Sequence, residues 1–306
     1  MVAEELARCA LFRHRGQRGA DVSGLYPWPD GNSGAFVLTV DVDGDVPLLW
    51  RSRGGRPRLA EMEQRLFGPR VGLQRLLDLF DRKQVTASFF VPGNYADRFP
   101  EHIAAIVDRG HEIGLHGYLH EAPTDLSKDE FAVSLERSIW ALRNAGGVSP
   151  TGFRSPSWDM TSDAFDVLTN SGLRYDSSMM GSDRPYLLNG MVEVPVQWTL
   201  DDAPFHRYVG GSAPGHPPLR PSELAARWCD ELDAATAYGT LAVLTVHDWL
   251  SGRATATAAL EQVLDHLASN DRLWRATADQ VAQWHENLPE GVSDSWALPQ
   301  VEAENT

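Results

Sequence analysis

The fold is decided by residues 86–115, TASFFVPGNYADRFPEHIAAIVDRGHEIGL. The first six of these residues form a short apolar run that predicts a strand at 86–91. Pro100 suits the first turn of a helix, and Gly110 suits its end. The residues that follow predict a second strand at 111–115. A strand, a helix and a strand in this order predict a βαβ unit, whose two strands lie parallel in one sheet.

The same alternation extends in both directions along the chain. Residues 35–41 (AFVLTVD) predict a buried strand, and apolar residues at helical spacing after Pro69 predict a helix that includes Phe80. Ser127 and Glu130 form a capping-box pattern that predicts a helix start. Further strands are expected at 152–155, 173–177, 191–196, 241–246 and near 273, and further helices at 161–172, 222–237, 256–267 and up to 286. Seven or eight strands alternating with helices favour one barrel-like α/β domain.

Three regions are predicted along the chain. Residues 1–33 lack clear periodicity and are interpreted as a peripheral amino-terminal arm, residues 34–286 as the barrel, and residues 287–306 as a flexible acidic tail. Two long connections interrupt the barrel pattern, at 44–68 and at 199–221, and the second is dense in Gly and Pro. Because long loops in compact domains tend to be functional, we expect these two to decide which substrate is accepted.

Charge and composition exclude several classes of partner. The 306 residues carry a formal net charge of −15, which would repel nucleic acid and an anionic membrane surface, so a neutral or cationic substrate fits better. The two cysteines, Cys9 and Cys229, are too far apart to indicate a disulfide framework or a cysteine zinc site. No apolar run approaches the roughly 20 residues of a membrane span, and the start of the chain lacks a signal-peptide pattern. We therefore expect a cytoplasmic protein.

Asp41 and Asp43 stand at the end of the first predicted strand. If the chain stays extended there, the two-residue period of a strand turns both carboxylates to the same face. Two acids on one face repel each other unless a cation neutralises them or one of them serves as a base with a shifted pKa. The alternative is a solvated turn, since Asp-Val-Asp-Gly-Asp is also typical loop chemistry.

His116 and His120 follow the strand at 111–115. On a helical turn, residues four apart lie on one face and can share a metal ion. Gly117 stands where a zinc metalloprotease would have Glu, so that motif fails. The alternative for this pair is two polar surface histidines.

The combination of these residues indicates a metal site. In a βα barrel the carboxyl ends of the strands open onto one face, so Asp43, His116 and His120 could bind a metal with positions left for water and substrate. Three further polar residues also fall at predicted strand ends; they are Arg154, Asp176 and His247. Each taken alone could be a surface ion pair, a turn acid or a histidine at the barrel rim. So many polar residues on one predicted rim favour an active site.

Four stretches, in order, resemble the polysaccharide deacetylase family, the NodB-like carbohydrate esterases. They are TVDVDG at 39–44, HGYLHE at 116–121, GFRSPSWD at 152–159 and LTVHDW at 244–249. The resemblance covers residues 35–286. It implies a single distorted (β/α)7 barrel, the NodB homology domain, in an enzyme that hydrolyses N-acetyl groups of amino sugars with zinc or another divalent metal.

The resemblance also implies a role for the polar residues at the rim. Asp41 is then the general base, Arg154 orients this base, and His247 is the general acid. The implied metal ligands are Asp43, His116 and His120.

Other residues are expected to line the substrate site. Trp158 would form part of its wall, and a backbone N–H near Ser157 or Trp158 would stabilise the oxyanion. An acid that tunes the catalytic histidine is also implied, and the sequence leaves Asp176 and Asp202 as alternatives. Trp50, in the first long loop, is a further candidate.

The motifs depart from the common family pattern in two places. Asp41 and Asp43 are separated by a valine where many members have adjacent aspartates, and Arg154 is followed by Ser-Pro-Ser-Trp rather than Pro-Pro and an aromatic residue. These variants resemble an intracellular branch that includes peptidoglycan-deacetylase homologues and allantoinase-like ring-opening enzymes. The substrate is therefore open between an N-acetylated sugar and a cyclic imide or ureide, and this branch also suggests a homo-oligomer, dimer or tetramer.

Two other classes of function share part of this residue pattern. Two histidines and one carboxylate also form the Fe(II) site of non-haem oxygenases, but those enzymes are usually rich in strands, whereas this chain alternates strands with helices. A barrel that binds sugar without catalysis is disfavoured because a base, metal ligands and an acid are all present.

Overall fold

The computed structural model describes residues 26–53, 55, 56, 58–206 and 219–299. Most of the predicted amino-terminal arm, with Cys9, lies outside the described residues. Residues 207–218 of the second long connection and the last seven residues of the predicted tail also lie outside the described residues. No helix among the described residues combines the length and the apolar character of a membrane span.

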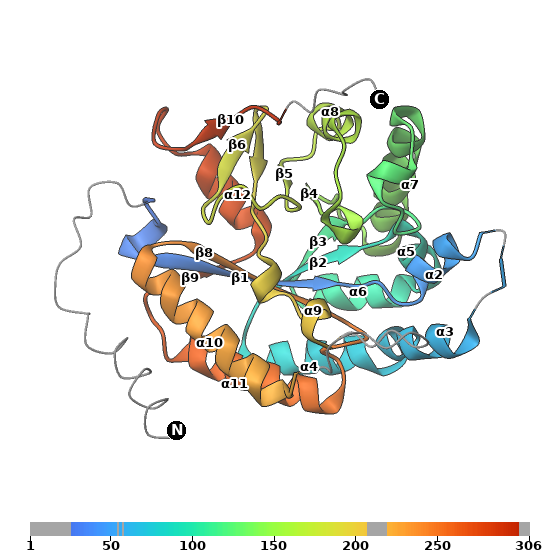
Figure 1. Ribbon diagram of the computed structural model, residues 1–306, viewed down its shortest axis with the longest axis horizontal. Coiled ribbons are helices and arrows are strands. Elements are labelled where there is room, and N and C mark those ends of the chain that lie inside the picture. Colours follow the sequence, from blue (N-terminus) through green and yellow to red (C-terminus); the bar gives the residue numbers. More distant parts are fainter. Residues whose placement is uncertain (1–25, 54, 57, 207–218, 300–306) are drawn as a thin grey trace, which may run out of the picture.

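Seven parallel strands of the described chain form the wall of an incomplete barrel (Figure 1). In spatial order they are β8 (Leu241–His247), β1 (Gly34–Asp41), β2 (Ser88–Val91), β3 (Glu112–Leu115), β4 (Gly152–Phe153), β5 (Tyr175–Asp176) and β7 (Met191–Glu193). The remaining strands are peripheral; they are β6 (Tyr186–Leu188), β9 (Leu273–Ala276) and β10 (Ser295–Trp296). This arrangement confirms the predicted distorted (β/α)7 barrel.

Helices cover the outside of this wall, and α4, α10 and α11 lie side by side along one flank (Figure 1). The helices are α2 (Val46–Arg51), α3 (Leu59–Arg65), α4 (Leu73–Lys83), α5 (Gly93–Arg98), α6 (Pro100–Asp108), α7 (Lys128–Gly146), α8 (Ser162–Asn170), α9 (Ala203–His206), α10 (Pro221–Tyr238), α11 (Ala254–Ala268) and α12 (Ala278–Glu286). Ser127 caps α7 in the predicted capping box, because its side chain accepts a hydrogen bond from the Glu130 N–H. Local capping therefore places this helix as the sequence indicates.

The connection 44–68 and the predicted tail are among the regions that are more ordered than their sequence predicts. The connection 44–68 contains the short helices α2 and α3, although it lacks an amphipathic pattern long enough to predict them. Part of the tail also docks on the barrel, because β10 pairs with β6 and Trp296 packs against Tyr186 with 4.7 Å between ring centroids. At the amino-terminal end of the described residues, Tyr26 and Trp28 are buried in a hydrophobic cluster. Aromatic burial thus anchors segments that carry no periodicity.

Strand β1 shows how the sequence builds both the core and the site. All eight of its residues are buried. Phe36, Leu38 and Val40 belong to the larger apolar cluster, whereas Ala35 and Val37 belong to a second cluster with strand residues from across the sheet. Because side chains alternate along a strand, Thr39 and Asp41 continue the face of Ala35 and Val37. This face changes from apolar to polar toward the carboxyl end of β1, where the site lies.

The barrel is not closed by a continuous ladder between β7 and β8. Instead, the side-chain amide of Gln197 donates to the Leu241 carbonyl and accepts from the Val243 N–H, both at 3.1 Å. Farther along, Asp201 pairs with Thr245 in an isolated bridge. The segment after β7 thereby carries two acidic residues to the carboxyl end of β8.

Candidate active site

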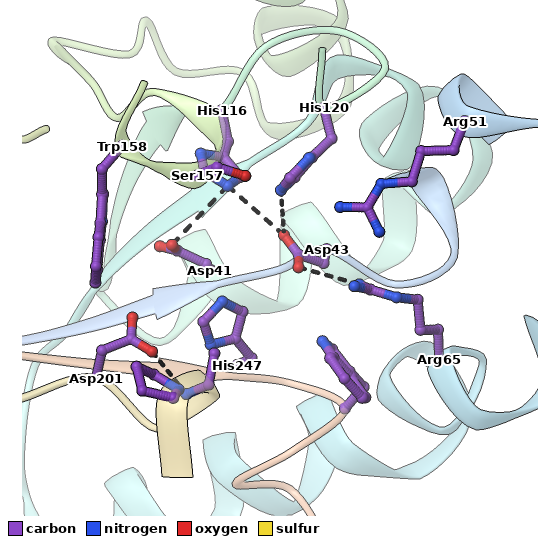
Figure 2. A pocket seen from close by; sticks show the side chains of 13 residues that line it. Asp41, Asp43, Arg51, Arg65, His116, His120, Ser157, Trp158, Asp201 and His247 are labelled. Carbon is purple, nitrogen blue, oxygen red and sulfur yellow. Dashed lines mark hydrogen bonds and ion pairs between the residues drawn. The ribbon is translucent and has the colours of Figure 1, made fainter. Parts of the chain in front are cut away.

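A cavity of about 410 Å³ opens at the carboxyl ends of the parallel strands (Figure 2). This is the rim where the sequence places the chemistry. The described residues that line the cavity are Asp41, Asp43, Arg51, Arg65, His116, His120, Ser157, Trp158, Asp201, Ala203, Pro204, His247 and Trp249. The structure therefore brings together residues that are more than 200 positions apart in the sequence.

Asp41 is held by a buried arginine. The side chain of Arg154 is fully buried, and its guanidinium donates to Asp41 Oδ1 at 2.9 Å and to Thr39 Oγ1 at 2.8 Å. It also donates to the hydroxyl and the carbonyl of Ser177 and lies over the Phe90 ring. The second oxygen of Asp41 is left facing the cavity, 3.9 Å from His116 Nε2. A carboxylate fixed through one oxygen with the other free is well placed to accept a proton.

Asp43 turns toward the same cavity because the chain stays extended for one residue beyond β1, where the Val42 N–H donates to the Phe90 carbonyl. Its Oδ2 accepts from Arg65 at 3.2 Å, while its buried Oδ1 accepts no hydrogen bond from the described residues. Burial raises the pKa of Asp43, but the nearby His120, His247 and Arg65 outweigh this and hold it well below its usual value. Asp43 is therefore an ionised carboxylate with one oxygen unpaired.

The two histidines converge on that oxygen. His116 Nε2 lies 3.6 Å and His120 Nε2 3.3 Å from Asp43 Oδ1. The spacing of His116 and His120 suggested that they share one helical turn. In the structure they lie on an irregular loop instead. Gly117 and His120 both take positive φ values, 69° and 58°, which no helix permits. The loop thus brings the two imidazoles together, as one helical turn would also have done.

The loop that carries the histidines is held by its neighbours. Nδ1 of His116 bonds the Arg154 carbonyl at 2.8 Å, so its Nε2 is directed into the cavity. The buried carboxylate of Glu121 accepts hydrogen bonds from the Leu119 N–H and the Ser134 hydroxyl, which ties the loop to α7. Burial lowers the pKa of His116 to about 4, which keeps this imidazole neutral. A neutral imidazole oriented through its other nitrogen is the form that binds a metal.

These three residues fit a divalent metal. Asp43, His116 and His120 each direct one ligand atom to a common point, and all three atoms lie within 4.8 Å of one another. In a tetrahedral site with bonds of about 2.0–2.1 Å, ligand atoms lie about 3.3 Å apart, close to the distances from Asp43 Oδ1 to the two histidines. The buried, unpaired Oδ1 of Asp43 is the observation that calls for a cation.

His247 ends β8 and faces the metal ligands from the opposite wall (Figure 2). Its Nδ1 bonds Asp202 Oδ1 at 2.6 Å, and its backbone N–H donates to Asp202 Oδ2 at 2.9 Å. The Ser251 hydroxyl also donates to this buried carboxylate. Burial lowers the pKa of His247, but Asp202 and, more weakly, Asp201 and Asp43 raise it well above its usual value. The imidazole is therefore held protonated, and Asp202 is the acid that bonds it.

Asp176, the other acid considered for that role, does not line the cavity. It ends β5 and is paired in register with Glu193 at the end of β7. The Ser178 hydroxyl donates to Asp176 Oδ1, and two backbone N–H groups donate to Glu193 Oε1. Burial raises the pKa of Asp176 to about 6, and burial together with the charge of Asp176 raises the pKa of Glu193 well above its usual value. The remaining oxygens, Asp176 Oδ2 and Glu193 Oε2, are buried and have no hydrogen-bond partner among the described residues, so we infer that the two carboxyl groups share one proton.

We predict that this shared proton makes stability depend on pH. Because the folded pKa of Glu193 is raised, its contribution is fully present below the unfolded value of about 4.3 and is lost as pH rises through the folded value. Glu193→Gln supplies the bridging hydrogen permanently through its amide. Urea unfolding from pH 5 to pH 9 should show a free energy of unfolding that falls for the wild type by on the order of 1–3 kcal/mol more than for this variant.

The control for that measurement is Glu286→Gln, which alters a solvent-accessible glutamate paired with Arg174. This variant should follow the wild type across the pH range. Parallel stability curves for the wild type and Glu193→Gln would show that the two carboxyl groups do not share a proton.

Ser157 and Trp158 line the cavity as expected, in a short 3-10 turn at Pro156–Trp158. Both have positive φ values, 60° and 57°, an unfavourable conformation for residues other than glycine and one often kept at functional sites. The Trp158 N–H already donates to the Ser155 carbonyl. The backbone N–H of Trp158 is therefore already used in a hydrogen bond, which leaves the backbone N–H of Ser157 as the other expected donor to the oxyanion. Trp50 does not line the cavity, and its indole donates instead to Asp125 at 3.1 Å.

Sequence reasoning missed four charged or aromatic residues that line the cavity; they are Arg51, Arg65, Asp201 and Trp249. Arg65 is buried, bonds Asp43, and lies 4.4 Å above the centre of the Trp249 ring. Burial raises the pKa of Asp201 to about 7. Asp201 carried one signal, its position next to Asp202 in a long loop, and Trp249 carried another, its place at the end of the motif at 244–249. The two arginines come from the connection 44–68, which offers no pattern from which their direction could be inferred.

Comparison with known proteins agrees with this geometry. Residues 67–175 match the family Polysaccharide deacetylase. A solved structure from Mycobacterium smegmatis, assigned to the polysaccharide deacetylases, is 35% identical with a TM-score of 0.83, and the alignment covers 91% of this chain and 98% of that one. The peptidoglycan deacetylase of Helicobacter pylori is 28% identical over 81% of this chain and 95% of its own length. An allantoinase structure, 20% identical with a TM-score of 0.76, covers 90% of this chain and 97% of its own and shares the fold.

The chain belongs to the polysaccharide deacetylase family. It is a hydrolase that acts on carbon–nitrogen amide bonds with a divalent metal. The family assignment made from four short motifs is thereby confirmed, and the oxygenase and the non-catalytic barrel are not supported.

Proposed function

We propose that this protein removes an acyl group, most simply acetyl, from the nitrogen of an amino sugar or a related small amide. Asp43, His116 and His120 hold the metal, and zinc is the metal proposed. Two imidazoles with one carboxylate are a set that zinc enzymes use, with positions left for water and substrate. The observation that carries the proposal is the pairing of two opposed proton carriers, Asp41 and His247, across one metal site (Figure 2).

The reaction needs one proton removed and one delivered. When bound, the metal would lower the pKa of a coordinated water and polarise the amide carbonyl. Asp41 takes a proton from the attacking water through the oxygen that Arg154 leaves free. The water oxygen bonds the carbonyl carbon, and the carbon–nitrogen bond then breaks.

His247 completes the reaction by donating its proton to the departing nitrogen, which leaves as an amine. Asp202 prepares it for this role, because the hydrogen bond at 2.6 Å fixes the ring and stabilises its charged form. The backbone N–H of Ser157 is the proposed donor to the developing oxyanion. The acyl group leaves as a carboxylate.

The cavity volume bears on the substrate. About 410 Å³ lies in the range of small-molecule sites, so one sugar residue or a small cyclic amide fits better than a long polymer segment. A ring amide of an imide or ureide is therefore the second candidate, since the same residues would open it. Both candidates need the same base, metal and acid.

The experiment is a substrate panel with the purified, metal-loaded protein. Metal content is measured by elemental analysis, acetate release is measured with N-acetylglucosamine and its oligomers, and ring opening is measured with cyclic imides and ureides. Bound zinc at about one ion per chain with turnover of at least one amide is the expected result. A protein that binds the metal but hydrolyses no amide of the panel would overturn the proposal.

A further inference from the structure

Arg51 carries a positive charge in the cavity that the catalytic arrangement does not use. Each acid of the arrangement already has a partner. Asp41 pairs with Arg154, and Asp43 pairs with Arg65. Asp202 is paired with His247. Arg51 lines the same cavity, and its guanidinium has no hydrogen bond or ion pair with any residue that the structure describes.

The position of Arg51 is fixed by its helix. At the start of α2, Asp45 is bound by both terminal nitrogens of Arg98, at 2.8 and 3.2 Å. At its end, Trp50 donates to Asp125. These two contacts hold α2 in place at the edge of the cavity, and they therefore fix the position of the Arg51 backbone.

The guanidinium points to one end of the cavity. In Figure 2 it lies on the side of His120 and Asp43 that faces away from Trp158 and Asp201. The Arg51 guanidinium therefore lies at one end of the cavity and the acidic side chain of Asp201 at the other, and the Asp43 carboxylate near the Arg51 end is already paired with Arg65. An anion is favoured at the end that holds Arg51.

From these contacts we propose that the substrate carries a carboxylate and that Arg51 binds it. A guanidinium offers paired N–H donors that match a carboxylate, which makes arginine a specific receptor for this group. The net charge of −15 favoured a neutral or cationic substrate, but the surplus charge of Arg51 creates a local exception. This inference rests on the proposed amide hydrolysis and narrows its substrate class to acidic amides.

The carboxylate could belong to the acyl side or to the amine side, and two probes separate these sources. N-succinylglucosamine has it on the acyl side, and 2-acetamido-2-deoxyglucuronic acid has it on the amine side. N-acetylglucosamine is the neutral reference. We expect the wild type to prefer one of the acids over the reference by about 10- to 100-fold in kcat/KM, as one charge-assisted hydrogen-bonded pair typically provides.

Arg51→Gln should abolish this preference, mainly through KM, and Arg51→Lys should restore only part of it because lysine lacks the paired donors. The matched control is Arg53→Gln. Arg53 is exposed near the same helix end, and its guanidinium covers the Trp50 ring instead of lining the cavity. This control should keep the preference. The inference is wrong if the wild type shows no preference, or if Arg51→Gln lowers all three rates in the same proportion.

A binding measurement separates failure of this inference from failure of the proposed function. Succinate is titrated calorimetrically into the zinc-loaded wild type and Arg51→Gln. If no probe is hydrolysed but succinate binding weakens about 10-fold or more in the variant, the proposed reaction fails and the carboxylate site stands. Equal binding by both proteins, as expected for a carboxylate bound only to the metal, would overturn the inference.

Discussion

Asp41→Asn is expected to keep its metal and to lose turnover by on the order of 10³-fold, within the range that a general base contributes. The asparagine side chain has nearly the same shape and can still accept the Arg154 hydrogen bond through its carbonyl, so the fold survives. It cannot take a proton from water. The measurement is kcat with the best amide of the panel, together with elemental analysis of the purified variant.

Asp43→Asn is the matched control, because it changes the same atoms two residues away. The two variants should both be inactive for different reasons, since only Asp43→Asn removes a charged metal ligand. Metal content near one ion per chain is expected for Asp41→Asn, and a much lower content for Asp43→Asn. If Asp41→Asn kept the wild-type rate, another group would have to accept the proton and the assignment of the base would fail.

The parts of the fold that the sequence predicted are those set by local patterns. Apolar runs predicted the strands β1 and β8 within one residue, and the Ser127–Glu130 capping box predicted the start of α7. The helices α2 and α3 were missed because neither exceeds seven residues, which is too short to show a repeated apolar face. Tertiary contacts such as Asp45 with Arg98 hold α2 in place, and no single-segment pattern contains them.

The residues of the candidate site also fall into those that local sequence patterns predict and those that only tertiary contacts place. Asp41, Asp43 and His247 could be placed at the rim because each lies at the end of a strand or just beyond it, and strand ends meet in a barrel. The choice between Asp176 and Asp202 could not be made, since Asp176 lies near the end of one strand candidate and Asp202 follows another, and only the path after β7 brings Asp202 beside His247. Arg65 was beyond reach for a further reason. Arg65 belongs to the site because its side chain points into the cavity. That orientation is set by contacts with Asp43 and Trp249, which lie in other parts of the chain.

His247→Gln is expected to lower kcat by about 10²- to 10⁴-fold, and the loss should depend on the departing amine. An alkyl amine or amino sugar leaves poorly without a proton, so its amides should lose the most. A nitroanilide leaves with little help, so its amide should lose far less. Steady-state rates for the two kinds of amide, measured with the wild type and the variant, give this ratio directly.

Asp202→Asn tests the same step through pH. The carboxylate of Asp202 holds the pKa of His247 well above its usual value, so the acid form persists in the wild type until pH rises through that raised value. Without the carboxylate the proton is lost at lower pH, and the alkaline limb of kcat/KM should move to lower pH by about one unit or more. Equal losses for both leaving groups in His247→Gln, with an unmoved alkaline limb in Asp202→Asn, would exclude His247 as the proton donor. An effect on both measurements would identify the imidazolium, prepared by Asp202, as the group that protonates the departing nitrogen.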